Sequence, residues 1–184
     1  MLANWDNLGI SGESNFLQLF YDPHSETLVA HFFRSIGRGY GLRSLWKRGV
    51  ADEKYVRITP SDTYLSFEDP VLCSSTAHVF ADVMRVERNE DGFDGYEWHS
   101  VQRIDLNTGA ADIIAGSGGF DTGQEKIWIS TLHGLSADCR ELFCSAAVQK
   151  KGEGAVSPTE YYLSKVVIGT GLIERITKLT ATFL

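Results

Sequence analysis

Strand-length apolar segments recur along this chain and constrain its fold more than any other feature. Short stretches rich in Val, Ile, Leu, Phe and Tyr alternate with clusters of Gly, Asp, Asn, Ser and Pro, as strands alternate with turns. We predict twelve strands, at Phe16–Tyr21, Thr27–Arg34, Gly41–Lys47, Tyr55–Thr59, Tyr64–Phe67, Ala77–Val86, Trp98–Leu106, Ala111–Ala115, Lys126–Thr131, Glu141–Val148, Tyr161–Ile168 and Ile173–Leu179. Twelve strands without a long helical pattern predict an all-β fold.

The strands also form an internal repeat. PVLCSSTAHVFADVMRV, a loop and EWHSVQRIDLNTGAADIIA align with HGLSADCRELFCSAAVQ, a loop and EYYLSKVVIGTGLIERITKL. Val79 then falls on Leu142, an offset of 63 residues, and Thr108-Gly109 falls on Thr170-Gly171. The N-terminal part fits the same template through LVAHFF, GLRSLWK and KYVRIT. A four-stranded antiparallel unit of this length is typical of a β-propeller blade, so we predict one domain of three units, at about 16–63, 64–125 and 126–184.

Two pieces of the third unit carry a family resemblance. GLSADCREL and LSKVVIGTG resemble the Ser-x-Asp-Gly-(Arg/Lys)-hydrophobic and Leu-x-x-(Val/Ile)-Asp-x-x-Thr-Gly signatures of TolB-like and related WD40-like β-propellers. The resemblance spans about residues 16 to 180. It departs at Cys139, where those repeats usually have a turn glycine, and at Ile168, where an acidic residue is common. Because these signatures recur in binding modules and enzymes alike, they imply a fold and no particular function.

Three blades are fewer than the four to eight of a closed propeller. We therefore expect half of a six-bladed ring, completed by a homodimer with two-fold symmetry. Two other readings stay open: a more compact arrangement, and a two-sheet sandwich with the same hairpins. The apolar C-terminal stretch KLTATFL fits a strand added to another sheet as well as an ordinary last core strand.

Composition limits the partners and the compartment. Seventeen Lys+Arg against 24 Asp+Glu give a net charge of −7, which disfavours nucleic acid and anionic membrane surfaces as partners. The first twenty residues contain no Lys or Arg and no long apolar run, so we expect no signal peptide, no membrane span and a cytoplasmic protein. The cysteines Cys73, Cys139 and Cys144 are expected to be reduced, with Cys144 the most buried and Cys139 the most reactive.

No cofactor or metal is predicted. The segment Gly116–Gly119 is rich in glycine but is not followed by a helix that could hold a phosphate, and a Gly-x-Ser-x-Gly element is missing. The histidines lack metal-site spacing, and we interpret His31 and His78 as satisfied or solvent-facing strand residues. The aromatic residues Trp46 and Trp98 are interpreted as packing between neighbouring blades.

Two groups of residues are candidates for function. His133 aligns with Asp69, each before the turn into its repeat, and the innermost strands of a propeller line its channel, so a ligand there would meet both. Three longer connections, around Ser35–Tyr40, Glu87–Tyr96 and Lys150–Glu160, are predicted loops. Loops on one face of a propeller would gather Arg38, Tyr40, Asp91, Asp94, Tyr96, Phe120 and Asp121.

These candidates support two functions of different classes. The first is a non-catalytic binding or scaffold module that presents its propeller loops to a protein or small-molecule partner. The alternative is a hydrolase or lyase in which Asp69, Asp121 and His133 surround a central channel, since paired carboxylates can divide acid and base roles when their environments separate their pKa values.

Overall fold

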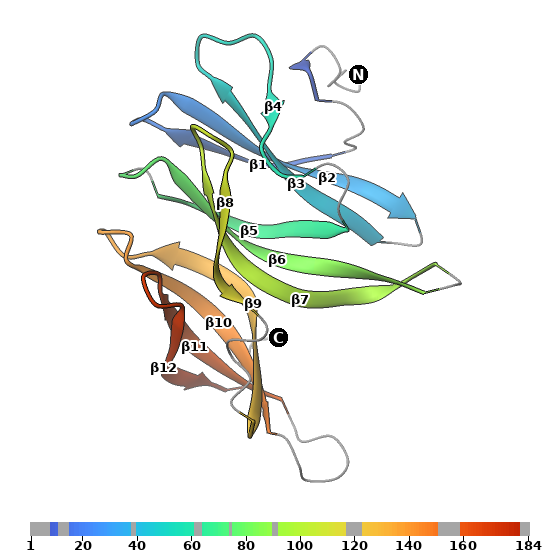
Figure 1. The fold of residues 1–184 in the computed structure, drawn as a ribbon, viewed down its shortest axis with the longest axis vertical. Coiled ribbons are helices and arrows are strands. Elements are labelled where there is room, and N and C mark those ends of the chain that lie inside the picture. Colours follow the sequence, from blue (N-terminus) through green and yellow to red (C-terminus); the bar gives the residue numbers. More distant parts are fainter. Residues whose placement is uncertain are drawn as a thin grey trace.

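A computed structural model of the chain describes residues 8–10, 15–37, 40–60, 64–73, 75–89, 92–116, 123–150 and 159–180. These residues form three four-stranded antiparallel sheets (Figure 1), with no α-helix among them. The predicted all-β fold of three blade-like units is therefore confirmed. Within the same ranges, no helix has the length and apolar character needed to cross a membrane.

Each sheet is a meander in which every strand pairs with the next along the chain. The first sheet contains β1 (Asn15–Asp22), β2 (Thr27–Gly37), β3 (Tyr40–Gly49) and β4 (Val56–Arg57). The second contains β5 (Leu65–Cys73), β6 (His78–Asn89), β7 (Gly92–Asp105) and β8 (Ala111–Gly116). The third contains β9 (Glu125–Leu135), β10 (Glu141–Lys150), β11 (Glu160–Val167) and β12 (Leu172–Leu179). Every predicted strand overlaps one of these twelve.

The sheets are stacked in chain order, with the second between the other two (Figure 1). Strand β5 contacts β3 of the first sheet and β9 of the third. Two cores fill the interfaces. Val29 and Leu45 of the first sheet pack with Val79 of the second, whereas Phe80 of the second packs with Leu142 of the third. Because successive side chains of a strand point to opposite faces, β6 contributes apolar side chains to both cores.

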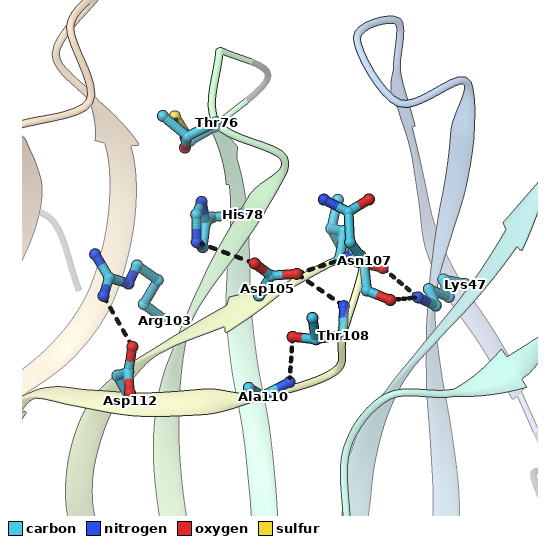
Figure 2. A network of polar contacts seen from close by, with 11 residues as sticks. Lys47, Thr76, His78, Arg103, Asp105, Asn107, Thr108, Ala110 and Asp112 are labelled. Carbon is cyan, nitrogen blue, oxygen red and sulfur yellow. Dashed lines mark hydrogen bonds and ion pairs between the residues drawn. The ribbon is translucent and has the colours of Figure 1, made fainter.

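The aligned Thr-Gly pairs form the same kind of turn. In the β7–β8 turn, Ala110 N–H donates to Thr108 Oγ1 at 3.1 Å and Gly109 has a φ of 75° (Figure 2). In the β11–β12 turn, Leu172 N–H donates to Thr170 Oγ1 at 3.3 Å and Gly171 has a φ of 68°. Glycine adopts this left-handed conformation without the steric cost of a Cβ, which explains its place in both turns.

The β7–β8 turn also joins two sheets. The carboxylate of Asp105 accepts hydrogen bonds from the backbone N–H groups of Asn107 and Thr108, at 2.7 and 2.8 Å (Figure 2). This Asx-type arrangement turns the carbonyls of Leu106 and Asn107 toward the first sheet, where Lys47 Nζ of β3 donates to both. The turn thus anchors the second sheet to the first.

Two of the predicted loops are largely strand. In the segment 35–40, β2 continues to Gly37 and β3 begins at Tyr40, and these two residues are paired. In the segment 87–96, β6 continues to Asn89 and β7 begins at Gly92, and these two residues are also paired. Backbone pairing in a hairpin satisfies the N–H and C=O groups whatever the charge of the side chains. The polar character of these segments in the sequence therefore did not indicate where the strands end.

The expectation of three reduced cysteines is wrong for two of them. Cys73 and Cys139 form a disulfide with their Cα atoms 6.1 Å apart, so Cys139 is not a reactive thiol. Cys144 is free and fully buried, as expected. Cys73 ends β5 and Cys139 lies in the β9–β10 turn, so each belongs to the first hairpin of its sheet. No local sequence pattern indicates this pairing, because it arises where stacking brings the corresponding turns of adjacent sheets together.

Candidate functional site

The first strands of the three sheets share one cavity. Its volume is about 390 Å³, and its walls come from Gln18 and Phe20 of β1, the segment 69–72 of β5, and Leu132 and His133 of β9. A second cavity of about 340 Å³ lies where all three sheets also meet, lined by Phe33, Gly41, Arg43, Glu68, Asp69, Asp82, Met84 and Ser130. Asp69 lines both cavities. The two predicted channel residues, Asp69 and His133, are therefore brought together.

Both of these residues sit at strand irregularities. The pairing of β5 with β6 shifts between Glu68 and Val71, which places Asp69 and Pro70 in a bulge. Asp69 has a φ of 43°, a left-handed conformation that aspartate tolerates better than most residues, and Pro70 has no N–H to donate to the ladder. In β9, the pairing with β10 passes from Leu132 to Gly134 and leaves His133 as the extra residue. Bulges redirect side chains and are over-represented beside active sites.

The two residues thus lie inside strands, whereas the sequence had placed them just before a turn. An Asp-Pro pair is a common turn signal, and here it marks a bulge instead. Both nevertheless line one cavity between the first strands of the three sheets.

The carboxyl group of Asp69 is half-buried, and burial raises its pKa. Three groups from other strands act in the opposite direction and favour its ionised form. These are the Arg43 guanidinium, the backbone N–H of Leu132, which donates to the carboxylate, and the His133 imidazole. Asp69 therefore links β5 electrostatically to both neighbouring sheets.

A second aspartate of this region was not found by sequence reasoning. Asp82 of β6 is 2% exposed, and its Oδ1 accepts a hydrogen bond from the Trp98 indole N–H at 2.6 Å. Burial raises the pKa of Asp82 to about 7, and the nearby charge of Asp69 acts in the same direction. The one available signal was a single aspartate within the apolar run VFADVM. Trp98 packs in the core between the second and third sheets, as interpreted, and also fixes Asp82.

Arg43 and Glu68 form an ion pair across the boundary between the first and second sheets. Ser66 Oγ donates to Glu68 Oε1 at 2.5 Å, and the Arg43 backbone N–H donates to Ser66 Oγ at 2.9 Å. Glu68 therefore neutralises much of the Arg43 charge. The carboxyl groups of Asp69 and Asp82 line the second cavity beside this ion pair.

The histidines have different roles. His31 is buried, and its Nε2–H donates to the Phe67 carbonyl at 2.9 Å, since a carbonyl only accepts. Burial lowers the pKa of His31 to about 4, so it is a neutral structural residue. His133 is exposed, and its Nε2 shares a hydrogen bond with Ser145 Oγ at 2.7 Å. His133 is thus accessible from the cavity that it shares with Asp69.

The structure does not describe the side chains of the predicted loop face. Arg38, Asp91, Phe120 and Asp121 lie outside the described residues, and the side chains of Tyr40, Asp94 and Tyr96 are not described. Of the nine predicted residues, Asp69 and His133 are the two that the described part places together. Among the described side chains, no group of three or more His, Cys, Asp or Glu residues is arranged to hold a metal ion.

Comparisons with known proteins give only weak likenesses, among solved structures. No protein-family model matches the chain, and no curated protein matches it. Among solved structures, the chain is similar to one described as "Crystal structure of puromycin hydrolase", with 10% sequence identity and a TM-score of 0.26. The alignment covers 91% of this chain and 38% of that one. The chain thus spans well under half of the length of that protein.

Proposed function

We propose that this chain is a non-catalytic binding module, made of three blades of the TolB-like or WD40-like type, that holds a small polar ligand in the cavity lined by β1, β5 and β9. The observation that carries the proposal is the position of Asp69, which lines this cavity and the adjoining one. Cavities of about this size suit small molecules.

The chemistry of the walls indicates the kind of ligand. In this cavity Asp69 accepts hydrogen bonds and His133 can donate or accept them, while Arg43 of the adjoining cavity is paired with Glu68. Hydroxyl and ammonium groups are the natural partners of such a carboxylate, so the ligand is a small polyol or amine. A pair of backbone bulges holds Asp69 and His133 in place, which reduces the conformational entropy lost on binding.

A thermal-shift screen of small amines and polyols tests this function. A ligand that binds the folded state alone, at a concentration of about 100 times its Kd, stabilises it by about 2.7 kcal/mol. The shift should disappear in Asp69→Asn and persist in Asp112→Asn, a matched change on the outer strand β8. A hit that stabilises wild type and Asp69→Asn equally contradicts the proposal, as does a panel in which no compound gives a shift.

A hydrolase or lyase is the second candidate, because Asp69 lines both cavities, Asp82 lines one of them and His133 lines the other. With a pKa of about 7, Asp82 retains a proton near neutral pH to a much greater extent than an ordinary aspartate. Asp82 would serve as the acid and Asp69 as the base. Turnover of a cavity ligand that is lost in both Asp82→Asn and Asp69→Asn would favour this candidate, whereas binding without product favours the first.

We also propose that two copies complete a six-bladed ring. The first and last sheets leave large apolar side chains exposed, namely Phe16, Leu17, Leu19 and Tyr21 on β1 and Leu172, Ile176 and Leu179 on β12. Light scattering should give twice the 20.4 kDa chain mass, and Ile176→Lys should reduce it to that of one chain. A wild-type monomer at all concentrations would exclude this assembly.

A further inference from the structure

We propose that the Cys73–Cys139 disulfide is a reversible thiol–disulfide exchange site that locks the second and third sheets together beside the candidate site. Its effect on ligand binding rests on the proposed function, but the exchange chemistry does not. The reaction partner is a dithiol, either a small molecule or a protein.

The disulfide is a covalent link between two separately built sheets. Cys73 is the last residue of β5, and Cys139 lies in the turn that joins β9 to β10, 66 residues later. The remaining contacts between these sheets are non-covalent, chiefly the apolar core around Phe80 and Leu142. Breaking the disulfide would therefore free one end of the interface without removing its core.

Two hydroxyl groups lie against the sulfur atoms. Thr76 Oγ1 donates a hydrogen bond to Cys73 Sγ at 2.9 Å. Ser75 Oγ is 3.3 Å from Cys73 Sγ and 3.5 Å from Cys139 Sγ. A thiolate accepts hydrogen bonds more strongly than a disulfide sulfur does, so both hydroxyls are placed to stabilise Cys73 as it leaves.

The exposure of the two cysteines indicates which sulfur atom is attacked. Cys73 is 1% exposed, whereas Cys139 lies partly exposed in a surface turn. An incoming thiolate therefore reaches Cys139 Sγ more easily. Attack there expels Cys73, and a better-stabilised leaving thiolate speeds the reaction.

The step balances without a further reactant. One sulfur of the dithiol bonds to Cys139 Sγ as the Cys73–Cys139 bond breaks, and Cys73 leaves as a thiolate. The second sulfur of the dithiol then attacks the first, which forms the oxidised partner and releases Cys139. Two electrons pass from the dithiol to the protein, and the two thiol protons of the dithiol end on Cys73 and Cys139.

The turn that holds Cys139 can keep its shape when the disulfide opens. Cys139 has a φ of 54°, a left-handed conformation that costs a non-glycine residue about 1 kcal/mol or more. The turn is nevertheless held by its own hydrogen bonds, with Cys139 N–H donating to the Ser136 carbonyl at 2.8 Å. The turn therefore has a framework that does not depend on the disulfide.

The disulfide joins β5 to the turn that follows β9, and both of these strands line the candidate site. β5 carries Asp69 four residues before Cys73, and β9 carries Leu132, whose N–H donates to the Asp69 carboxylate. Reduction should loosen this contact.

The test treats the oxidised, full-length, ligand-free chain with dithiothreitol without denaturant. We expect complete reduction, unchanged far-ultraviolet circular dichroism, and amide exchange at Leu132 faster by roughly tenfold, because local opening becomes easier. Thr76→Val should slow reduction roughly threefold or more by removing the donor to the leaving sulfur. The control Thr177→Val, on the exposed strand β12, should reduce at the wild-type rate.

Three results would overturn the proposal: a disulfide that is reduced only in denaturant, loss of the sheet signal on reduction, or unchanged exchange at Leu132. Because none of these measurements uses a ligand, they stand whether or not the cavity binds one. Conversely, Asp69-dependent binding with equal affinity in the oxidised and reduced proteins would support the proposed function. It would contradict the proposed effect of the disulfide on the site.

Discussion

The indole N–H of Trp98 donates to the Asp82 carboxyl at 2.6 Å, in a position where Asp82 is almost completely shielded from water. Burial disfavours the charged form by more than this hydrogen bond and the Val83 N–H favour it, so the pKa of Asp82 rises to about 7. The folded protein therefore holds a proton that the unfolded chain releases near pH 4.

This proton makes stability depend on pH. Between about pH 4 and 7 the folded state binds more protons at Asp82 than the unfolded state, so its contribution to the free energy of unfolding falls as pH rises, by on the order of 4 kcal/mol. Asp82→Asn removes this decline while its amide oxygen still accepts from Trp98. Urea unfolding across that range checks this; an unchanged pH slope in Asp82→Asn would contradict it.

His31 has the opposite effect. Burial lowers its pKa to about 4, so between about pH 4 and 6.5 the unfolded state binds more protons and stability rises with pH, by on the order of 3 kcal/mol. The two contributions largely cancel in the wild type. In His31→Gln, the free energy of unfolding should therefore fall as the pH rises. In Asp82→Asn, it should increase as the pH rises. Parallel slopes in the two variants would show that one assignment is wrong.

The two turn glycines give a matched pair of substitutions. A Cβ at Gly109 would meet nothing within 4 Å, so Gly109→Ala should cost only the left-handed backbone penalty, about 1 kcal/mol. A Cβ at Gly171 would lie 2.4 Å from the Ile114 carbonyl oxygen of β8, so Gly171→Ala should cost clearly more, about 3 kcal/mol. Equal losses in urea unfolding would mean that the β11–β12 turn does not approach β8.

Thiol counting checks the cysteine assignment. The unreduced protein should show no reactive thiol when native, because burial raises the pKa of Cys144 to about 12 and the disulfide occupies the other two cysteines. One thiol should appear in denaturant and three after reduction. Three thiols in denaturant without a reductant would show that the disulfide is absent.

Local patterns predicted the sheets well because hairpins depend on nearby residues. The aligned positions Val79 and Leu142 are both fully buried, and the Thr108-Gly109 and Thr170-Gly171 pairs form equivalent turns. Alternation of apolar residues and turn chemistry fix such features over a few residues.

The site was less predictable because it depends on how separate sheets meet. The Cys73–Cys139 bond joins residues whose proximity follows only from stacking. The hydrophobic pattern does not indicate the bulges at Asp69 and His133. In the sequence, Asp82 is a single polar residue in an apolar strand, and its hydrogen bond with Trp98 is known only from the structure.

The central claim is that Asp69 and His133, from different sheets, meet in one cavity. The most direct test is the titration of the Asp69 carboxyl carbon by NMR in wild type, His133→Gln and His24→Gln. Since protonated His133 favours the ionised carboxylate, the pKa of Asp69 should be higher in His133→Gln than in wild type and unchanged in His24→Gln, a variant in the β1–β2 turn. An Asp69 titration identical in all three proteins would contradict the account.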